Sequence, residues 1–249
     1  MLTTIKRSAR QLAKQFGLDL HRLDPLASEH TRLALLLAAN QVDLVLDIGA
    51  NTGQWARELR RAGYASDMIS FEPLIGAHEE LRKHAVHDRR WAIAPRVALG
   101  ERNDDVEIHV AGNSVSSSLL QMLPLHATGA PKSVYVRSEK TPMVTLDSLV
   151  GKIIPSDRRI FCKLDVQGYE AKVLAGAVKL LKNTIGLQLE LSLAPLYQGQ
   201  PTFGELLDTM SRSGFEIFGF VPGFVDPSSG RMLQVDGVFF RSAAGDATP

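Results

Sequence analysis

The sequence predicts an α/β fold in which one open, mainly parallel sheet carries helices on both faces. Short apolar runs typical of strands alternate with helical patterns along most of the 249 residues. The first run, 42–48 (VDLVLDI), is almost continuously apolar, as expected for a strand buried on both faces. Acidic side chains follow several strands, and in such folds ligands bind outside the carboxyl ends of the strands.

The composition is that of an ordinary globular protein with one large domain. Apolar residues make up 45% and charged residues 22%, and the formal net charge of +1 provides no overall field that would attract nucleic acid. The single cysteine, Cys162, excludes an intramolecular disulfide. No apolar run approaches the roughly 18 residues that a membrane-spanning helix needs. The sequence therefore predicts a cytoplasmic protein without a nucleic-acid partner.

The chain is predicted to divide into an N-terminal helical extension (1–40), a main domain (41–242) and a flexible tail (243–249). The first 18 residues predict a basic amphipathic helix, because Ile5, Leu12 and Phe16 lie on one stripe at helical spacing. Such a helix either docks on the domain surface or makes peripheral contact with an anionic membrane or a partner.

The first half of the chain follows the alternating pattern. The helix after the first strand ends at Gly63, a natural position for a glycine just past a helix C-terminus. Glu72-Pro73 closes the second strand, and Gly100 closes the third. The predicted helices cover 28–40, 54–62 and 75–86, and the predicted strands cover 42–48, 67–71 and 92–99.

Residues 101–145 predict a small insertion of strands and loops. The run 105–110 (DVEIHV) alternates like an antiparallel strand, and 133–146 contains another. The segment between them, GNSVSSSLLQMLPLHATGAP, is rich in turn residues, so it is predicted to be a functional loop or lid.

The second half returns to alternating strands and helices and ends on a closing strand. The predicted strands cover 160–164, 185–191, 215–221 and 235–241, and the predicted helices cover 169–182 and 204–213.

The turn after the first strand, Gly-Ala-Asn-Thr-Gly, has the character of a ligand-binding turn. Gly49 and Gly53 permit positive φ and close approach of the backbone, and the following helix presents free N–H groups. The chain lacks both the G-x-G-x-x-G fingerprint and the G-x-x-x-x-G-K-[ST] phosphate loop. Glu72, at the end of the second strand, is placed to accept hydrogen bonds from a ribose diol. Turn and acid together favour a ligand with an adenosine-like ribose.

Four acids follow or end strands that meet at this edge of the sheet. Each alone could be a helix cap or a solvated charge, but their shared position favours a site. They are Asp47, Glu72, Asp165 and Glu190.

Eight short motifs lie along most of the chain: LVLDIGANTGQWA (44–56), SFEPL (70–74), VALG (97–100), SSSLL (116–120), VTLDSL (144–149), KLDVQGYEAKVLAGA (163–177), LQLELSLAPLYQGQ (187–200) and LQVDGVFF (233–240). In sequence and in order they resemble the FkbM-type family of S-adenosylmethionine-dependent methyltransferases. The resemblance is to a bacterial subgroup associated with O-methylation of sugars on glycolipids and related natural products. It implies a Rossmann-like class I methyltransferase fold with a mainly parallel seven-stranded sheet.

The resemblance also implies which residues bind S-adenosylmethionine. The turn residues would line the methionine end, Asp47 would orient the turn or meet the amino group, and Glu72 would bind the ribose hydroxyls. Ala98 and Leu99, at the end of the third strand, would pack near the adenine. The predicted cofactor-binding residues are Asp47, Gly49, Asn51, Thr52, Gly53, Glu72, Pro73, Ala98 and Leu99.

A sugar hydroxyl is a poor nucleophile, so a base or a metal should help it to lose its proton. Asp165 is the first candidate base and Glu190 the second, with His126 a further candidate on the substrate side. A Mg²⁺ ion held by Asp165, Glu190 and Asp236 is an alternative. Gln167 stands where many family members carry Glu, which weakens an acid–base or metal role at that position.

The sequence therefore predicts an S-adenosylmethionine-dependent O-methyltransferase whose acceptor is a sugar or glycolipid hydroxyl. Two alternatives stay open: a non-catalytic protein that binds the cofactor as a sensor or scaffold, and a nicotinamide-dependent oxidoreductase.

Overall fold

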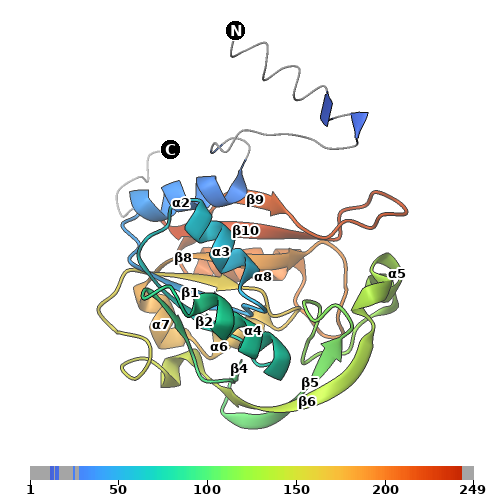
Figure 1. The fold of residues 1–249 in the computed structure, drawn as a ribbon, viewed down its shortest axis with the longest axis horizontal. Coiled ribbons are helices and arrows are strands. Elements are labelled where there is room, and N and C mark those ends of the chain that lie inside the picture. Colours follow the sequence, from blue (N-terminus) through green and yellow to red (C-terminus); the bar gives the residue numbers. More distant parts are fainter. Residues whose placement is uncertain (1–11, 14, 17–24, 26–27, 243–249) are drawn as a thin grey trace.

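The computed structural model describes residues 12–13, 15–16, 25 and 28–242 (Figure 1). Most of the predicted N-terminal basic helix and the whole tail 243–249 lie outside these residues, so both stay predictions. Within the described part, no helix has the length and apolar character to cross a membrane.

The core of the molecule is a seven-stranded sheet in which all neighbours are parallel except β10, which is antiparallel to both β8 and β9. This confirms the predicted mainly parallel sheet. In spatial order the strands are β3 (Trp91–Ile93), β2 (Asp67–Phe71), β1 (Leu44–Ile48), β7 (Ile160–Leu164), β8 (Thr184–Ser192), β10 (Gln234–Arg241) and β9 (Phe215–Pro222).

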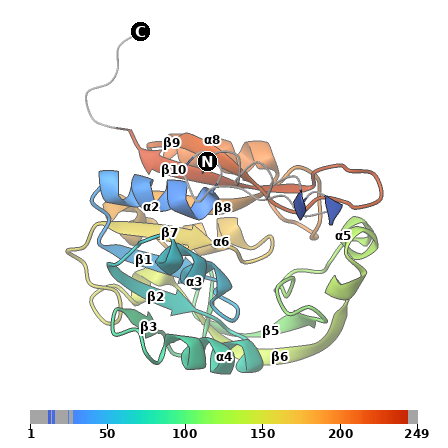
Figure 2. The same cartoon turned by 45° about the horizontal axis from the view of Figure 1, so that its top comes forward.

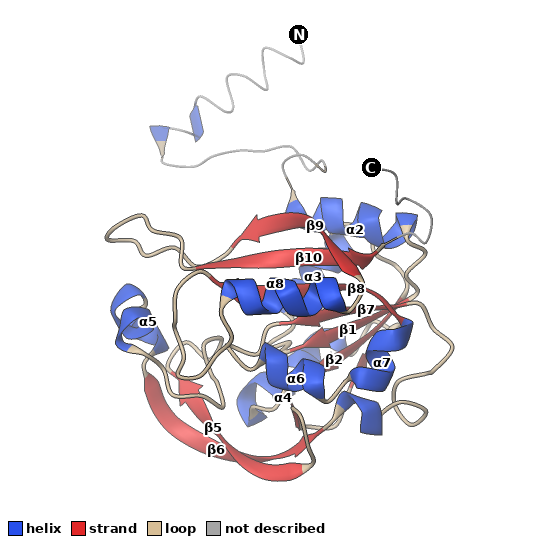
Figure 3. Ribbon diagram, turned by 180° about the vertical axis from the view of Figure 1, so that it is seen from behind, coloured by secondary structure: helices blue, strands red, loops and turns tan. Residues whose placement is uncertain are grey.

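Within the residues that the structure describes, three helices cover each face of the sheet. One face packs against α2 (Glu29–Ala39), α3 (Gln54–Arg61) and α4 (Ile75–Ala85), which lie in front in Figure 1. The other packs against α6 (Glu170–Ala175), α7 (Val178–Asn183) and α8 (Phe203–Arg212), which lie in front in Figure 3.

The helix starts are set by local chemistry. Ser28 caps α2 by accepting the N–H of Thr31, and Thr202 with Glu205 forms a capping box at α8. Gly63, with φ +103°, follows the C-terminus of α3 as predicted.

The predicted insertion forms a second sheet of β4 (Ala98–Leu99), β6 (Tyr135–Val144) and β5 (Asp104–Ala111), in that order, with the short helix α5 (Pro124–Gly129) between β5 and β6. In Figure 2, α5 and the hairpin that joins β9 to β10 lie at the same end of the molecule, beyond the carboxyl ends of the parallel strands. The insertion therefore stands beside the edge where a ligand is expected.

The single strand predicted over 92–99 is wrong, because two strands in different sheets replace it. Trp91–Ile93 pairs with β2, whereas Ala98–Leu99 pairs with β6. Pro95 lies between them and has no N–H to donate to a ladder, so pairing with β2 ends before it.

The predicted helix over 169–182 is also broken, into α6 and α7. Gly176 ends α6, and a Cβ at this position would lie 2.0 Å from the carbonyl oxygen of Gly100. Because Gly176 has no side chain, the backbone after β4 can pack directly against the break between α6 and α7.

Strand register places polar side chains in two rows on the face that α2 and α3 cover. Asp47 pairs with Lys163, and Lys163 pairs with Gln188. Further along, Glu190 pairs with Asp236. Because side chains alternate between faces, these groups share the face of Val45, Phe161 and Val238, which pack in the core beneath α2 and α3.

Candidate active site

A cleft opens at the carboxyl ends of β1 and β2, between the main sheet and the insertion. It encloses about 590 Å³, its solvent-open mouth included. One part of the lining is apolar, with Val97, Ile108 and Leu119, and another is polar, with Glu72 and Asp165.

The cleft brings together six of the nine predicted cofactor-binding residues. Asp47, Thr52 and Gly53 do not line it, whereas the candidate base Asp165 does. The six lining residues are Gly49, Asn51, Glu72, Pro73, Ala98 and Leu99.

Glu72 lies at the base of the cleft and is almost fully buried. Its carboxylate oxygens accept the backbone N–H groups of Asn51 and Leu74, each at 2.8 Å. Burial raises its pKa to about 7, although those hydrogen bonds and Lys163 oppose the shift. The two N–H bonds fix the carboxylate while leaving lone pairs free for a ligand hydroxyl.

Asn51 holds the turn through its side chain. With φ +47° it adopts a left-handed conformation; its Oδ1 accepts the N–H of Thr52 at 2.9 Å, and its Nδ2 donates to Ser114 Oγ at 3.1 Å. The second bond joins the turn to the serine loop (Ser114–Ser118) of the insertion, so a predicted lid segment contacts the predicted cofactor turn.

The two glycines of the turn serve different purposes. A Cβ at Gly49 would lie 1.9 Å from the carbonyl oxygen of Asp165, so Gly49 lets the loops after β1 and β7 touch. A Cβ at Gly53 would instead meet Leu81 and Trp91 at 2.7–2.8 Å. Gly53 therefore serves the packing of α3 on α4 and β3, and lies away from the cleft.

Asp47 is fully buried behind the cleft and forms an ion pair with Lys163 at 3.4 Å. Burial raises the pKa of Asp47, and Lys163 and the hydroxyl of Ser70 oppose that shift. Lys163 Nζ also donates to the carbonyl oxygen of Gly49 at 3.1 Å. The pair thus orients the turn from behind, one of the two roles that the resemblance implied for Asp47.

Gln167 joins the two acids that the sequence singled out as candidate bases. Its Nε2 donates to Asp165 Oδ1 at 2.8 Å and to both oxygens of Glu190 at 3.0–3.1 Å. Its Oε1 accepts the hydroxyl of Tyr197 at 2.7 Å. The substitution of Gln for Glu thus provides a neutral donor between two carboxylates, a role that sequence reasoning missed.

Asp236, Glu190 and Asp165 lie in different environments. Burial, then Asp165, raises the pKa of Asp236 to about 6. Burial, Asp165 and other neighbouring carboxylates raise the pKa of Glu190 well above its ordinary value. Asp165 is the open one: its side chain is 41% exposed, and Lys163 lies 3.4 Å from Oδ2.

The acids do not form a metal site. Across residues 12–13, 15–16, 25 and 28–242, no three His, Cys, Asp or Glu side chains gather as ligands for an ion. The amide nitrogen of Gln167 lies between Asp165 and Glu190 and is a donor, which cannot ligate a cation. The Mg²⁺ alternative therefore has no support here.

His126 lies in α5 and does not line the cleft. Its ring contacts Tyr197 and Phe224, with centroids 5.1 and 5.3 Å away, and burial lowers its pKa to about 4. This position makes His126 a packing residue between the insertion and the β9–β10 hairpin, rather than a base at the cleft.

Two residues beyond the predicted set complete the link between insertion and sheet. Tyr197 is fully buried, and its hydroxyl contacts the carbonyl oxygen of Ser116 as well as Gln167. Ser118 donates to the backbone oxygen of Gln167 at 2.7 Å. Gln167 and Gly168 both have positive φ, so the contacts of Gln167 come from a tight turn that the sequence did not reveal.

Known proteins of similar sequence are methyltransferases, which agrees with a cleft suited to a small-molecule cofactor. Residues 47–217 match the family described as the methyltransferase FkbM domain. The 2-O-methyltransferase NoeI of Sinorhizobium fredii is 24% identical over 232 residues, which cover 88% of this chain and 90% of that protein.

Among solved structures, a candidate O-methyltransferase from Klebsiella pneumoniae is similar with a TM-score of 0.50 at 10% identity, over 95% of this chain and 89% of that chain. This likeness concerns the fold alone and agrees with the predicted class I methyltransferase fold. With more than half of its length matched by the family, the chain belongs to the FkbM methyltransferases.

Proposed function

We propose that this protein transfers a methyl group from S-adenosylmethionine to a hydroxyl of a sugar, carried on a glycolipid or a related natural product. Family membership supports methyl transfer, and similarity to a 2-O-methyltransferase supports an oxygen acceptor. The observation that carries the proposal is the half-exposed carboxylate of Asp165 at the lining of the cleft.

The cleft residues fit the chemistry of this cofactor. The buried carboxylate of Glu72 suits two ribose hydroxyls, and the backbone at Gly49 and Asn51 suits the amino acid end. The apolar part of the lining, near Ala98 and Leu99, suits an adenine ring. S-adenosylmethionine held there would supply an electrophilic methyl group, with its sulfur as the leaving group.

In this proposal Asp165, which lines the cleft, takes the proton that the acceptor hydroxyl loses as its new O–C bond forms. Its carboxylate contacts Lys163 Nζ at 3.4 Å and accepts a hydrogen bond from the amide of Gln167 at 2.8 Å. Glu190 has a raised pKa and is shielded by Gln167, so it is the weaker candidate for an ionised base.

Turnover tests the proposal directly. The protein is incubated with methyl-labelled S-adenosylmethionine and a panel of glycolipids and oligosaccharides, and the product is mapped by mass spectrometry. Label on a sugar oxygen supports the proposal. Cofactor binding without transfer to any acceptor would favour a sensor, and tighter binding of NAD than of S-adenosylmethionine would favour an oxidoreductase.

Cofactor affinity should depend on pH through Glu72. Ribose hydroxyls donate to the ionised carboxylate, so affinity is full above its pKa of about 7 and falls as the pH drops through that value. Calorimetry with S-adenosylhomocysteine should give binding about tenfold weaker at pH 6 than at pH 8. The Glu72→Gln variant should bind weakly with no such slope, and an equally flat profile in the unaltered protein would refute the role.

A further inference from the structure

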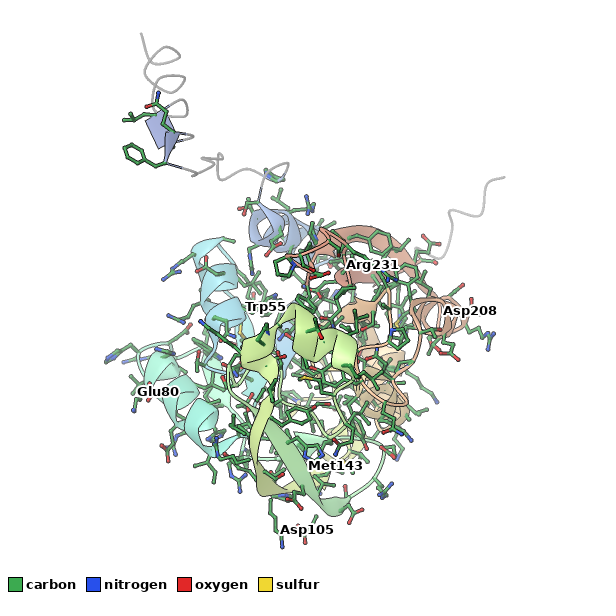
Figure 4. All side chains as sticks on the ribbon, turned by 90° about the vertical axis from the view of Figure 1, so that its right-hand side faces the viewer. Trp55, Glu80, Asp105, Met143, Asp208 and Arg231 are labelled. Atoms are coloured by element: carbon green, nitrogen blue, oxygen red, sulfur yellow. The ribbon has the colours of Figure 1, made fainter. Side chains whose placement is uncertain are left out.

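A sharp turn over residues 165–169 joins β7 to α6, and we call it the β7–α6 turn. Figure 4 faces the end of the molecule at which this turn lies, with Met143 of the second sheet below and Arg231 of the β9–β10 hairpin above. Within the turn, Gln167 with φ +54° and Gly168 with φ +93° are both left-handed. Because a left-handed conformation is strained for a residue with a Cβ, contacts outside the turn must hold it in place.

Glu170, the first residue of α6, holds the β7–α6 turn from within the protein. It is only 2% exposed, and its Oε1 accepts the N–H of Val166 at 3.0 Å and the N–H of Gly168 at 3.3 Å. These two N–H groups lie on either side of Gln167, so one oxygen fixes the backbone before and after the left-handed residue. Burial raises the pKa of Glu170 to about 7, and the N–H bonds oppose that shift.

The β7–α6 turn carries the carboxylate on which the proposed transfer depends. Asp165 and Val166 line the cleft, whereas Glu170 does not. The N–H of Asp165 donates to the carbonyl oxygen of Ile48 at 3.1 Å, and its carboxylate accepts the amide of Gln167 at 2.8 Å. That amide can orient Asp165 only while the turn backbone stays in place. Misplacement of a reacting group by about 1 Å can lower a rate about 100-fold.

We propose that Glu170 is a positioning residue for methyl transfer. Through the N–H groups of Val166 and Gly168 it fixes the β7–α6 turn, and the turn in turn fixes Asp165 at the cleft. This inference rests on the proposed function, in which Asp165 is the base. A carboxylate that only caps the start of a helix would contribute to stability alone, whereas a positioning residue also determines the rate of transfer.

Two variants of Glu170 separate these roles. Glu170→Gln keeps an acceptor oxygen of the same reach, whereas Glu170→Met has a similar length and no oxygen. Single-turnover transfer is measured at pH 8, above the pKa of Glu170, with S-adenosylmethionine in excess. Glu170→Met should lower the rate roughly 10–100-fold, and Glu170→Gln should restore most of it. Both should keep their affinity for S-adenosylhomocysteine, because Glu170 does not line the cleft.

Asp147→Leu is the matched control, because Asp147 also accepts two backbone N–H groups where a helix starts. Its carboxylate bonds to Lys179 and Leu180 of α7 at 2.9–3.0 Å, and it does not line the cleft. The control should lower the midpoint of urea unfolding about as Glu170→Met does and should leave the transfer rate unchanged. If Glu170→Met does not fold, Glu170→Asp replaces it: the carboxylate is withdrawn by one C–C bond, and the rate should again fall.

Amide hydrogen exchange gives a second readout that needs no acceptor. The N–H groups of Val166 and Gly168 should exchange faster in Glu170→Met than in Glu170→Gln or the unaltered protein. If an acceptor is methylated but Glu170→Met transfers as fast as Asp147→Leu, Glu170 only stabilises the fold: the inference is overturned and the proposed function stands. If no acceptor is methylated, the proposed function fails. Faster exchange then supports Glu170 as the group that fixes the turn, and unchanged exchange overturns it.

Discussion

Replacement of Asp165 by Asn is expected to lower the rate of methyl transfer by about 10²–10⁴-fold, the usual loss when a general base is removed. The asparagine has the same shape and can still accept the hydrogen bond from Gln167, but it cannot take a proton from the acceptor hydroxyl. Affinity for S-adenosylhomocysteine should change little, because Glu72 and the turn at Gly49 hold the rest of the cofactor site. Single-turnover transfer and calorimetry measure the two effects separately.

Glu190→Gln is the informative companion variant, since the sequence left both acids as candidate bases. Its carboxyl is held by Gln167 and has a raised pKa, so the amide should reduce the rate far less than Asp165→Asn does. The reverse ranking, with Glu190→Gln almost inactive and Asp165→Asn nearly normal, would move the base from β7 to β8. Thermal unfolding of both proteins checks that neither loss comes from misfolding.

Most elements of the main sheet were predictable because their signals are local. The strands 67–71 and 160–164 coincide with β2 and β7, since each is a short apolar run bounded by polar or turn residues. The two errors came from contacts distant in sequence. The helix 169–182 breaks where Gly176 meets the carbonyl of Gly100, a neighbour that no periodicity within the helix reveals.

The candidate site was predictable where a rule about topology applied. Parallel strands end at one edge, so Glu72 and Asp165 could be expected in one cleft before any coordinates were known. The bonds that give each acid its character could not be anticipated. Gln167 bonds to Glu190, 23 residues away, and to Tyr197, 30 residues away, and no local sequence pattern reveals either contact.

One buried lysine, Lys163, contacts some of the carboxylates at the carboxyl ends of the strands and not others, and this difference separates their roles. Lys163 is shared between Asp47, which it holds behind the turn, and Asp165, which it faces at the cleft. Although burial opposes it, the two carboxylates raise the pKa of Lys163 above its ordinary value, so it stays charged. Glu190 and Asp236 instead accept hydrogen bonds from neutral amides, those of Gln167 and Gln188. Of these three acids, Asp165 is therefore the one that combines contact with Lys163 and a side chain open to solvent.

Gly49→Ala is expected to abolish cofactor binding and to destabilise the fold by several kcal/mol. The new Cβ would lie 1.9 Å from the carbonyl oxygen of Asp165, and backbone on both sides leaves nothing flexible to yield. The loops after β1 and β7 must therefore separate, which displaces the turn from Lys163 and moves Asp165. Urea denaturation and calorimetry with S-adenosylhomocysteine measure the two losses.

Gly151→Ala is the control that distinguishes the steric clash of a Cβ from the strain of a left-handed backbone conformation. Gly151 has φ +77°, almost the same as the +75° of Gly49, but a Cβ there meets nothing within 4 Å. Its replacement should cost only about 1–2 kcal/mol, the penalty for a left-handed residue with a Cβ, and should leave binding intact. Equal destabilisation by the two substitutions would show that φ alone requires glycine at position 49. A larger loss at Gly49, coupled to loss of the cofactor, would establish that direct contact between the β1 and β7 loops builds the site.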